Sequence, residues 1–195
     1  MDYLREAFSD LYAENDRMEK IYADMAEPSD PNELDRQISK ANKILERLTD
    51  AGFFELDSTI KKVAGGLGIA ALGYDTVIAT LSGGQRAKLM LARLLLERPD
   101  IMLLDEPTNF LDVEHIDWLT EYLNSVKGTF MVISHDTAFL DKVTKFIVSI
   151  ENGSIKKYGG NYSTYISQAE QNAKQYEESY RRQQEEIKRM EDYIA

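Results

Sequence analysis

Apolar side chains recur along the first 52 residues at alternating intervals of four and three. This spacing is the a/d seam of a coiled coil, in which one stripe of a helix packs against a second helix. The seam positions are Leu4, Phe8, Leu11, Asn15, Met18, Tyr22 and Met25 in the first half, and Leu34, Ile38, Ala41, Leu45 and Leu48 in the second. The pattern therefore predicts two helices that face each other.

The segment between the two seams predicts a break and a new helix start. Residues 27–31 read Glu-Pro-Ser-Asp-Pro. Asp30 is a good N-cap, Pro31 suits the first helical position, and Glu33 would complete a capping box. We expect an antiparallel helical hairpin that ends at Gly52, because glycine is a common residue at helix C-termini.

Residues 53–81 indicate a short helix followed by turns. The glycines of this segment are Gly65, Gly66, Gly68 and Gly73. A dinucleotide-binding fingerprint would open a helix directly after a strand, whereas Gly-Gly-Leu-Gly here follows a helical pattern. We therefore interpret the cluster as turn chemistry.

Helical and extended patterns alternate in the next part of the chain. Residues 85–97 and 114–126 have helical spacing, while residues 101–104 and 130–133 are short apolar runs. Such runs are typical of parallel strands buried on two faces. We expect a βαβ unit and hence an α/β fold.

The remaining residues predict a hairpin and a long polar helix. Residues 146–150 and 154–158 flank the turn signal Asn152-Gly153. The helix that follows has few sizeable apolar side chains and therefore needs a partner. They are Tyr162, Tyr165, Ile166, Tyr176, Tyr180, Ile187, Met190 and Ile194.

Composition narrows the class of protein. The chain has 195 residues, 43% of them hydrophobic, so it is long enough to bury a core. It has no cysteine, which excludes disulfides and thiolate metal sites. No apolar run reaches the ~18 residues of a membrane span, and the N-terminus does not resemble a signal peptide, so a cytoplasmic protein is expected. The net charge of −11 argues against general nucleic-acid binding, but a few arginines could still make a local contact.

The first chemical motif is Leu81-Ser82-Gly83-Gly84-Gln85, directly before an expected helix. A helix N-terminus offers unpaired amides and a positive dipole end, the two glycines let a phosphate approach, and the serine hydroxyl adds a donor. These residues predict a phosphate grip. An isolated Ser-Gly-Gly would more simply be a helix cap, but the full string followed by a basic residue is more specific.

The second motif is Asp105-Glu106, at the carboxyl end of the expected strand 101–104. Ligands of open α/β sheets bind at this end of the strands. We assign magnesium binding to Asp105 and the role of general base toward the attacking water to Glu106. Two solvated acids in a loop are the alternative, which the preceding apolar run and the following Pro107-Thr108 disfavour.

The third motif is His135, which also follows an expected strand, between Ser134 and Asp136. A lone histidine is more often structural than catalytic. Its position parallels that of the two carboxylates, so we expect it to reach the same phosphate as a donor. His115, the other histidine, lies on an expected helix and has no assigned role.

The phosphate-binding loop that should accompany these motifs is absent from the 195 residues. A P-loop requires Gly-x-x-x-x-Gly-Lys followed by Ser or Thr. No lysine of the chain is followed by either residue. The sequence thus has three parts of an ATP-hydrolysing site without the loop that wraps the phosphates.

In this order and spacing, residues 81–85, 101–112 and 132–136 resemble the signature, Walker B with D-loop, and switch-histidine motifs of an ATP-binding cassette (ABC) domain. The resemblance implies a P-loop NTPase fold that uses ATP and Mg²⁺, with two cassettes facing each other head to tail. The residues implied to grip an ATP held by another cassette are Ser82, Gly83, Gly84 and Gln85. Those implied to serve their own cassette's ATP are Asp105, Glu106 and His135. Asp112 would lie at the interface as the D-loop acid.

Residues 105–112 resemble the ABC-F branch, which comprises soluble twin-cassette proteins that act on ribosomes. That branch typically has His where this chain has Phe110. The hairpin resembles the arm inserted before the signature motif, and residues 158–163 with the following helix resemble the start of the linker between cassettes. Since that linker follows the first cassette, we expect the chain to be part of a first cassette.

The resemblance divides the chain into four expected segments. They are an arm-like hairpin (1–52), a helical subdomain up to the signature motif (53–81), the C-terminal part of the ATPase core (82–158) and an incomplete linker helix (159–195). We expect a truncated cassette without its Walker A half, inactive by itself and prone to self-association. Its expected partners are a second cassette of the same polypeptide and the rRNA or tRNA of the ribosome.

Two other classes of protein remain open at this stage. The ATPase subunit of a membrane transporter shares all three motifs, but the arm-like insertion and the charged last helix argue against it. A non-enzymatic coiled-coil interaction module would account for the helices. It would leave Asp105, Glu106 and His135 unexplained.

Overall fold

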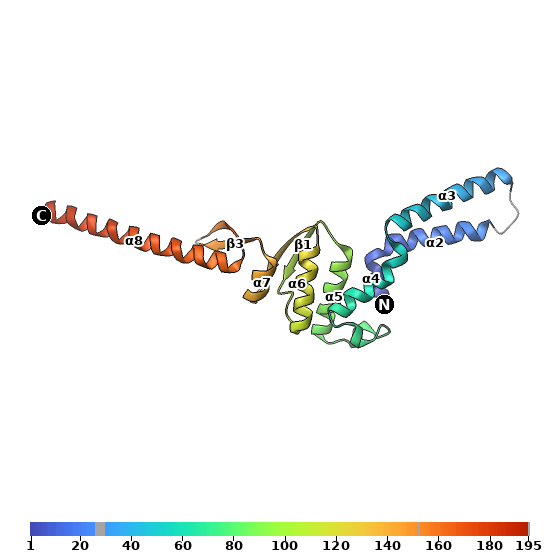
Figure 1. Cartoon of the computed structure of the whole chain (residues 1–195), viewed down its shortest axis with the longest axis horizontal. Coiled ribbons are helices and arrows are strands. Elements are labelled where there is room, and N and C mark those ends of the chain that lie inside the picture. The colour runs from blue at the N-terminus through green and yellow to red at the C-terminus, as the bar shows by residue number, and fades with distance from the viewer. Residues whose placement is uncertain (26–29, 152, 195) are drawn as a thin grey trace. The chain divides into compact units, whose positions relative to one another are not determined.

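The computed structural model describes residues 1–25, 30–151 and 153–194, which form two compact units, Met1–Ile133 and Ser134–Ala195 (Figure 1). The first contains α1 (Asp2–Arg5), the 3-10 helix η1 (Glu6–Phe8), α2 (Ser9–Asp24), α3 (Pro31–Asp50), η2 (Phe53–Glu55), α4 (Leu56–Gly66), η3 (Ala70–Leu72), η4 (Ile78–Thr80), α5 (Gly83–Glu97), β1 (Ile101–Asp105), α6 (Val113–Ser125) and β2 (Thr129–Ile133). The second contains α7 (Thr137–Val143), β3 (Phe146–Glu151), β4 (Ser154–Gly159) and α8 (Tyr162–Ile194).

The helices α2 and α3 lie side by side as a hairpin (Figure 1). Met18, Ala41 and Leu48 are buried between them. Partly buried apolar side chains pack around these three, namely Leu11, Ile21, Met25, Ile44 and Phe53. The predicted pair of facing helices is thus confirmed.

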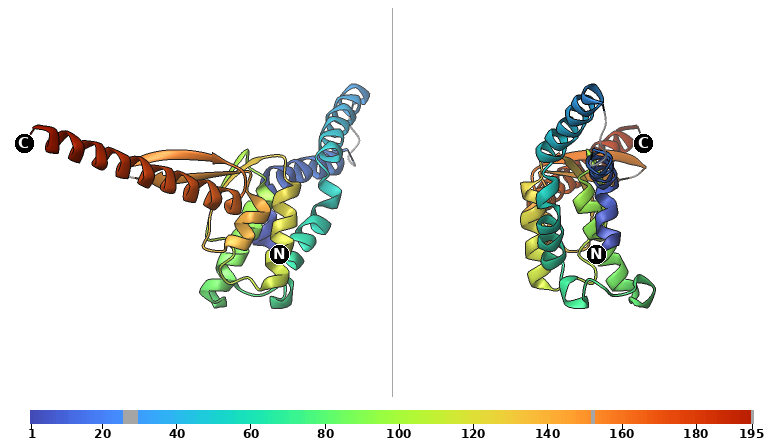
Figure 2. Two further views of the ribbon diagram at one scale, coloured as in Figure 1. Left: turned by 60° about the vertical axis from the view of Figure 1, so that its left-hand side comes forward. Right: turned by 90° about the vertical axis from the view of Figure 1, so that its right-hand side faces the viewer.

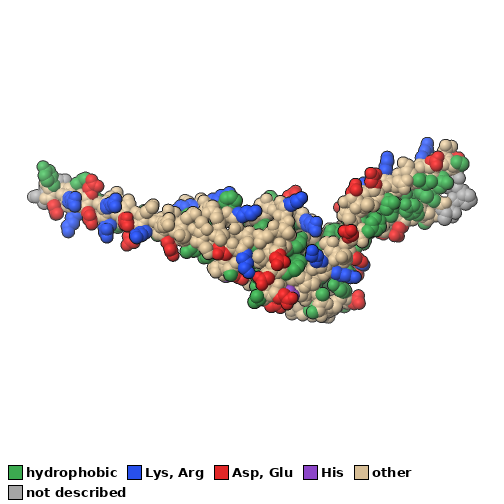
Figure 3. Space-filling view, viewed as in Figure 1, with side chains coloured by type: hydrophobic (Ala, Val, Ile, Leu, Met, Phe, Trp, Pro, Cys, Tyr) green, Lys and Arg blue, Asp and Glu red, His purple; other side chains and the backbone are tan. Residues whose placement is uncertain are grey.

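Part of the predicted seam lies outside this contact. The exposed seam positions are Tyr22 (45%), Leu34 (37%), Ile38 (42%) and Leu45 (36%). Ile21 and Ile44 pack in the hairpin core instead of the residues that follow them. A straight helix repeats every 3.6 residues, so a stripe spaced at 3.5 drifts by about 20° per heptad. The seam prediction was therefore wrong at these four positions. Figure 3 shows apolar side chains along the surface of the hairpin.

The ends of α3 follow most of their sequence signals. Asp30 is the N-cap residue and Pro31 the first helical residue, but among the described residues the Asp30 side chain accepts no capping hydrogen bond. Gly52 follows the helix with φ 69°, a left-handed conformation that costs glycine little. Residues 27–29 of the predicted break lie outside the described part of the chain.

The helix α4 packs against both α5 and α6 in the core of the first unit (Figure 2). The largest fully buried side chains of this unit are Leu48, Ile60, Leu67, Leu95, Met102, Leu119 and Leu123. The Tyr122 hydroxyl donates to the Leu95 carbonyl at 2.6 Å, which ties α6 to α5. These contacts fix the two helices that flank β1 in the chain.

Two glycines allow α6 to approach the end of α4. A Cβ atom at Gly66 would lie 2.0 Å from the Trp118 ring, and one at Gly68 would lie 2.2 Å from His115 Nε2. Interiors are close-packed, so a larger residue would push α6 away. Gly68 also has φ 70°, as a turn requires. The turn interpretation of the glycine cluster was therefore incomplete, because the cluster also permits this packing.

The strands β1 and β2 pair in parallel, from Ile101 opposite Thr129 to Asp105 opposite Ile133, with α6 between them in the chain. This confirms the predicted βαβ unit. The expected burial on both faces was wrong. Met102 and Leu104 are buried in β1, whereas Leu103 is 71% exposed. Within the described chain, one face of this pair is covered and the other is bare.

The start of the chain is tied to the helices of the same unit by ion pairs. Arg5 donates to both carboxylate oxygens of Asp57, at 3.0 and 2.8 Å. These hydrogen bonds lower the pKa of Asp57 below its ordinary value. Arg93 on α5 pairs with Glu6 at 2.6 Å. The N-terminal segment is thus held against α4 and α5.

In the second unit, β3 and β4 form an antiparallel hairpin that packs against α8 (Figure 1). The register runs from Phe146 opposite Gly159 to Glu151 opposite Ser154. The predicted hairpin is confirmed. Asn152 of its turn lies outside the described residues.

The first turn of α8 is tied to α7. The Ser163 backbone N–H and hydroxyl donate to the two carboxylate oxygens of Asp141, at 2.7 and 2.5 Å. These bonds hold the pKa of Asp141 below its ordinary value. Asn161 adds a cap, since its side-chain oxygen accepts from the Thr164 N–H at 3.1 Å. The long helix therefore starts from a fixed turn.

The hairpin packing predicts a contrast between two leucines of α3. Leu48→Ala should lower the free energy of unfolding of the hairpin by about 2–4 kcal/mol, because Leu48 is fully buried. Leu45→Ala, the matched control at a 36% exposed position, should cost less than about 1 kcal/mol. Urea unfolding followed by circular dichroism measures both. Equal losses would show that the seam packs as first expected.

The Asp141 contact predicts a pH-dependent anchoring of α8. A carboxyl whose folded-state pKa is lowered stabilises the fold above its unfolded pKa of ~3.9, and this contribution is lost as the pH falls through the lowered pKa. At pH 7, Asp141→Asn should therefore increase hydrogen exchange at the Ser163 and Thr164 amides. Asp192→Asn, near the other end of α8, is the control. The difference from wild type should shrink in acid, and equal exchange at pH 7 would contradict the anchoring role.

Candidate functional site

Ser82 and Gln85 form a complete capping box at the start of α5. The Ser82 hydroxyl oxygen accepts from the Gln85 N–H at 3.3 Å, and the Gln85 side-chain oxygen accepts from the Ser82 N–H at 2.8 Å. A hydroxyl has one hydrogen to donate besides its acceptor sites. The capping bond uses only an acceptor site, so Ser82 can cap the helix and still donate to a phosphate.

Arg86 fixes the segment that leads into this motif. Its guanidinium donates to the Leu81 carbonyl at 3.0 Å and to the Ala79 carbonyl at 3.3 Å. The basic side chain after the signature string thus closes the preceding turn rather than pointing only to solvent. The motif enters α5 in one defined conformation.

Gly84 lies directly against an aromatic ring from the D-loop. A Cβ atom at Gly84 would lie 2.9 Å from two ring atoms of Phe110. Gly83, in contrast, has no described neighbour within 4 Å of such an atom. The two glycines therefore differ: one leaves open space for a ligand, and the other accommodates Phe110.

Glu106 begins a tight turn after β1. Its backbone N–H donates to the Ile133 carbonyl at 2.8 Å, and its carbonyl accepts from the Asn109 N–H at 3.1 Å. Its φ is 47°, which is uncommon for a residue other than glycine. Such a conformation costs about 1–3 kcal/mol and persists only where the surroundings impose it, often at functional sites.

Asp105 ends β1 with an exposed side chain beside this turn. Mg²⁺ is usually held by one or two carboxylates together with phosphate oxygens and water, so a single exposed carboxylate fits its chemistry. Among the described residues, no group of three or more His, Cys, Asp or Glu could hold a metal ion. Magnesium binding by Asp105 stays a prediction.

A groove of about 470 Å³ is lined by the end of β1, the turn that follows it and the middle of α5. The described lining does not include Ser82, Gly83, Gly84 or Gln85. Asp105, Glu106, Lys88 and Phe110 are among its lining residues. Sequence reasoning missed Lys88 and Phe110 as parts of this site. Lys88 lies four residues after Gly84, one helical turn along the same face, and that spacing could have identified it.

Asp112 is the N-cap of α6. Its side chain accepts from the His115 backbone N–H at 3.2 Å, and the same oxygen lies 3.6 Å from His115 Nε2. The structure thus gives Asp112 a local capping role. Its role at an interface between cassettes stays a prediction.

His135 belongs to the second unit, at the entry to α7. Its neighbours fix this entry: the Asp136 N–H donates to the Ser134 hydroxyl oxygen at 3.1 Å, and the Asp136 side chain caps α7 by accepting from the Phe139 N–H at 2.9 Å. The grouping of His135 with the carboxylates of the first unit stays a prediction.

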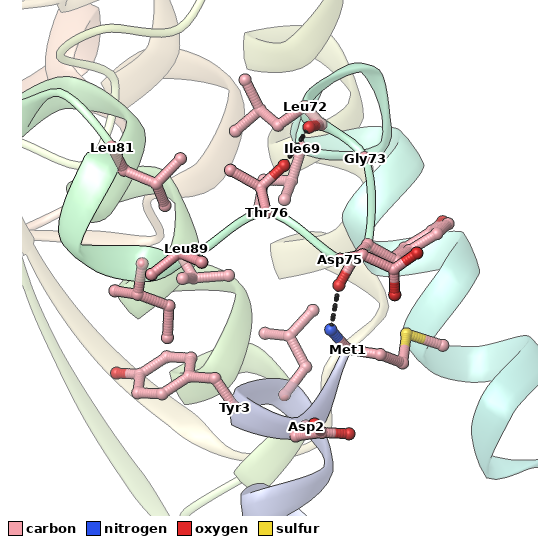
Figure 4. Close-up of a pocket in the computed structure, with 14 residues that line it drawn as sticks. Met1, Asp2, Tyr3, Ile69, Leu72, Gly73, Asp75, Thr76, Leu81 and Leu89 are labelled. Carbon is pink, nitrogen blue, oxygen red and sulfur yellow. Dashed lines mark hydrogen bonds between the residues drawn. The ribbon is translucent and has the colours of Figure 1, made fainter.

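A second hollow, of about 380 Å³, lies between α1, residues 69–78 and α5 (Figure 4). The Met1 ammonium donates there to the Tyr74 carbonyl at 2.5 Å. Leu81 lines it, but none of the predicted site residues is among its described lining. The candidate site is therefore the groove beside Glu106.

These features define an ATP-binding cassette domain. A family model described as "ABC transporter" matches residues 9–109, which include residues 81–85 and the carboxylates of Asp105 and Glu106. A second model with the same description matches residues 148–195. The first match alone spans more than half of the chain, and the chain therefore belongs to the ABC transporter family. The predicted α/β fold class is confirmed.

Two of the relatives illustrate the range of names in this family. The chain is 41% identical over 194 residues to the uncharacterised ABC transporter ATP-binding protein YfmM of Bacillus subtilis, covering 100% of this chain and 37% of YfmM. It is 35% identical over 168 residues to the energy-dependent translational throttle protein EttA of Escherichia coli K12, covering 86% of this chain and 30% of EttA. Homology to ABC-F proteins such as EttA is thus confirmed, and the chain spans about a third of the length of these relatives.

Among solved structures, the ATP-binding subunit of an ABC transporter matches 54% of this chain and 45% of its own, with 22% identity and a TM-score of 0.48. In the part of the chain that the structure describes, no helix is both long and apolar enough to cross a membrane.

Proposed function

We propose that the intact protein binds and hydrolyses ATP between two cassettes, and that this chain contributes residues to both ATP sites. The observation that carries the proposal is the closed turn that starts at Glu106, directly after Asp105 at the end of β1, beside a groove that the middle of α5 also lines. The positive φ of Glu106 is a conformation that persists only where the surroundings impose it, and such residues cluster at functional sites.

Each predicted residue has a role in this proposal. Glu106 orients the attacking water and accepts its proton, while Asp105 would hold Mg²⁺. Magnesium, when bound, neutralises charge on the phosphates. The free Ser82 donor and the amides beside open Gly83 grip the γ-phosphate of an ATP held by the other cassette. His135 donates to the phosphate served by Glu106, and Asp112 lies at the cassette interface.

The 195 residues alone should not turn over ATP. No lysine among them is followed by Ser or Thr, so no P-loop is present to hold the phosphates. Turnover would require the P-loop of the same cassette and a second cassette that faces it.

We further propose that hydrolysis is coupled to translation on cytoplasmic ribosomes. EttA, to which this chain is homologous, is named a translational throttle protein. Two helical segments that ATP chemistry does not use, the α2–α3 hairpin and α8, are available for such a partner. The basic side chains of α8 that could contact rRNA or tRNA are all exposed; they are Lys174, Arg181, Arg182, Lys188 and Arg189.

A transporter ATPase subunit is the second candidate function. The name of YfmM, an ABC transporter ATP-binding protein, favours it. The two candidates share the ATP chemistry and differ in the partner that the cassette drives.

The ATPase proposal predicts the effect of one substitution in the intact protein. Glu106→Gln keeps the shape of the side chain but removes the base, so the turnover number should fall by about 10²–10⁴-fold. Glu121→Gln, on the exposed face of α6, is the matched control and should leave turnover unchanged. Release of inorganic phosphate measures both. Wild-type turnover in the Glu106 variant would rule out its role as base.

The translation proposal predicts where the intact protein is found. With Glu106→Gln and ATP, the protein should co-sediment with purified ribosomes, because slowed hydrolysis prolongs the ATP-bound state. It should not co-purify with membrane permease subunits. Recovery in the membrane fraction together with a permease, and none with ribosomes, would instead support the transporter reading.

A further inference from the structure

We propose that Phe110 is a positioning residue that fixes the signature turn of α5 relative to the catalytic turn at Glu106. The inference rests on the proposed ATPase function. It concerns a side chain that the motif assignments leave without a role, at the one position where residues 105–112 depart from the pattern typical of the branch they resemble.

The contact itself is close. A Cβ atom at Gly84 would meet Phe110 at 2.9 Å from Cδ1 and Cγ and at 3.2 Å from Cβ. Separations of this kind leave room only for glycine, so the ring lies against the backbone of the signature motif. A displacement of Phe110 toward α5 must therefore push that backbone, because no flexible side chain stands between them.

Phe110 is also fixed to the same turn as Glu106. Both residues have positive φ, 67° for Phe110 and 47° for Glu106. Two backbone hydrogen bonds close the segment between them: Asn109 N–H to the Glu106 carbonyl and Leu111 N–H to the Thr108 carbonyl, each at 3.1 Å. The position of the ring is thus set by the conformation that also presents Glu106.

Stability alone does not account for this ring. Phe110 is 67% exposed, and an aromatic ring so exposed buries little area. It nevertheless adopts a left-handed backbone that a bulky residue rarely adopts. Packing energy therefore does not explain why this exposed side chain is held in an unfavourable conformation against a glycine. A role in positioning the Gly84 backbone does.

The consequence for the proposed function is a mechanical link between two ATP sites. Gly84 belongs to the grip on an ATP held by the other cassette, whereas Glu106 acts on the ATP of its own cassette. Because Phe110 joins the two motifs by direct contact, a shift of one turn is passed to the other. Without the ring, the turn at Glu106 and the start of α5 at Gly84 should each keep their structure, but their positions relative to each other should no longer be fixed.

The choice of variants follows from this geometry. Phe110→Ala removes the ring and leaves the open space at Gly83 unchanged. Gly84→Ala would place a methyl group against the Phe110 ring and also change the proposed phosphate grip. It therefore could not separate the two effects. Phe110→His keeps a planar ring and introduces the residue typical of the ABC-F branch. Phe54→Ala, at a 62% exposed phenylalanine of the same unit, is the matched control.

The first arm of the test uses this chain alone. The reporters are the Gln85 amide, bonded to the Ser82 hydroxyl, and the Arg86 amide, bonded to the Ser82 carbonyl. Phe110→Ala should increase hydrogen exchange at both amides several-fold, Phe110→His should restore it, and Phe54→Ala should leave it at the wild-type value. Unchanged exchange in Phe110→Ala would overturn the positional link without any reference to ATP hydrolysis.

The second arm uses the intact protein. Phe110→Ala should lower kcat by about tenfold with the KM for ATP and the thermal midpoint unchanged, since a small misplacement of catalytic groups costs rate rather than binding. Phe110→His should recover most of kcat. If Glu106→Gln abolishes turnover but Phe110→Ala does not change kcat, this inference fails and the proposed function stands. If Glu106→Gln has no effect, the proposed function itself fails.

Discussion

The parallel pairing of β1 with β2 is the constraint on which the candidate site depends. Its last register pair places Asp105 opposite Ile133, and the Glu106 N–H then donates to the Ile133 carbonyl. This bond extends the ladder one residue past the strand while the Glu106 backbone has already left the β region. The chain must therefore turn sharply at the residue that carries the proposed base. Strand pairing thus sets where this carboxylate leaves the sheet.

The elements that the sequence predicted well are those decided by local chemistry. Pro31 is the first residue of α3, and Gly52 follows that helix in a left-handed conformation, both as predicted. Each outcome depends on a few neighbouring residues, which a sequence displays directly. The same holds for the alternation of helix and strand from α5 to β2, where short apolar runs and stop signals follow each other closely.

The features that the sequence could not supply are those decided between elements. Whether Tyr22 or Ile21 faces α3 depends on the rotation of a whole helix, and both residues are apolar. The ring of Trp118 over Gly66 and that of Phe110 over Gly84 join residues far apart in the chain. A single sequence shows that a glycine is present but not which ring requires it. For the groove, the helical spacing from Gly84 could have indicated Lys88, whereas the contact of Phe110 with Gly84 could not be read from the sequence.

The bare face of the β1–β2 pair relates the fold to the proposed function. Parallel strands in α/β proteins are normally covered on both faces, yet Leu103, Met131 and Ile133 are all more than half exposed. Apolar surface of this kind marks a place where further protein packs. The proposed site needs additional protein for a separate reason: the nucleotide that its carboxylates are proposed to serve requires a P-loop, and these 195 residues contain none. Packing and chemistry thus lead independently to the same expectation: the end of β1 completes its site only together with another part of the cassette.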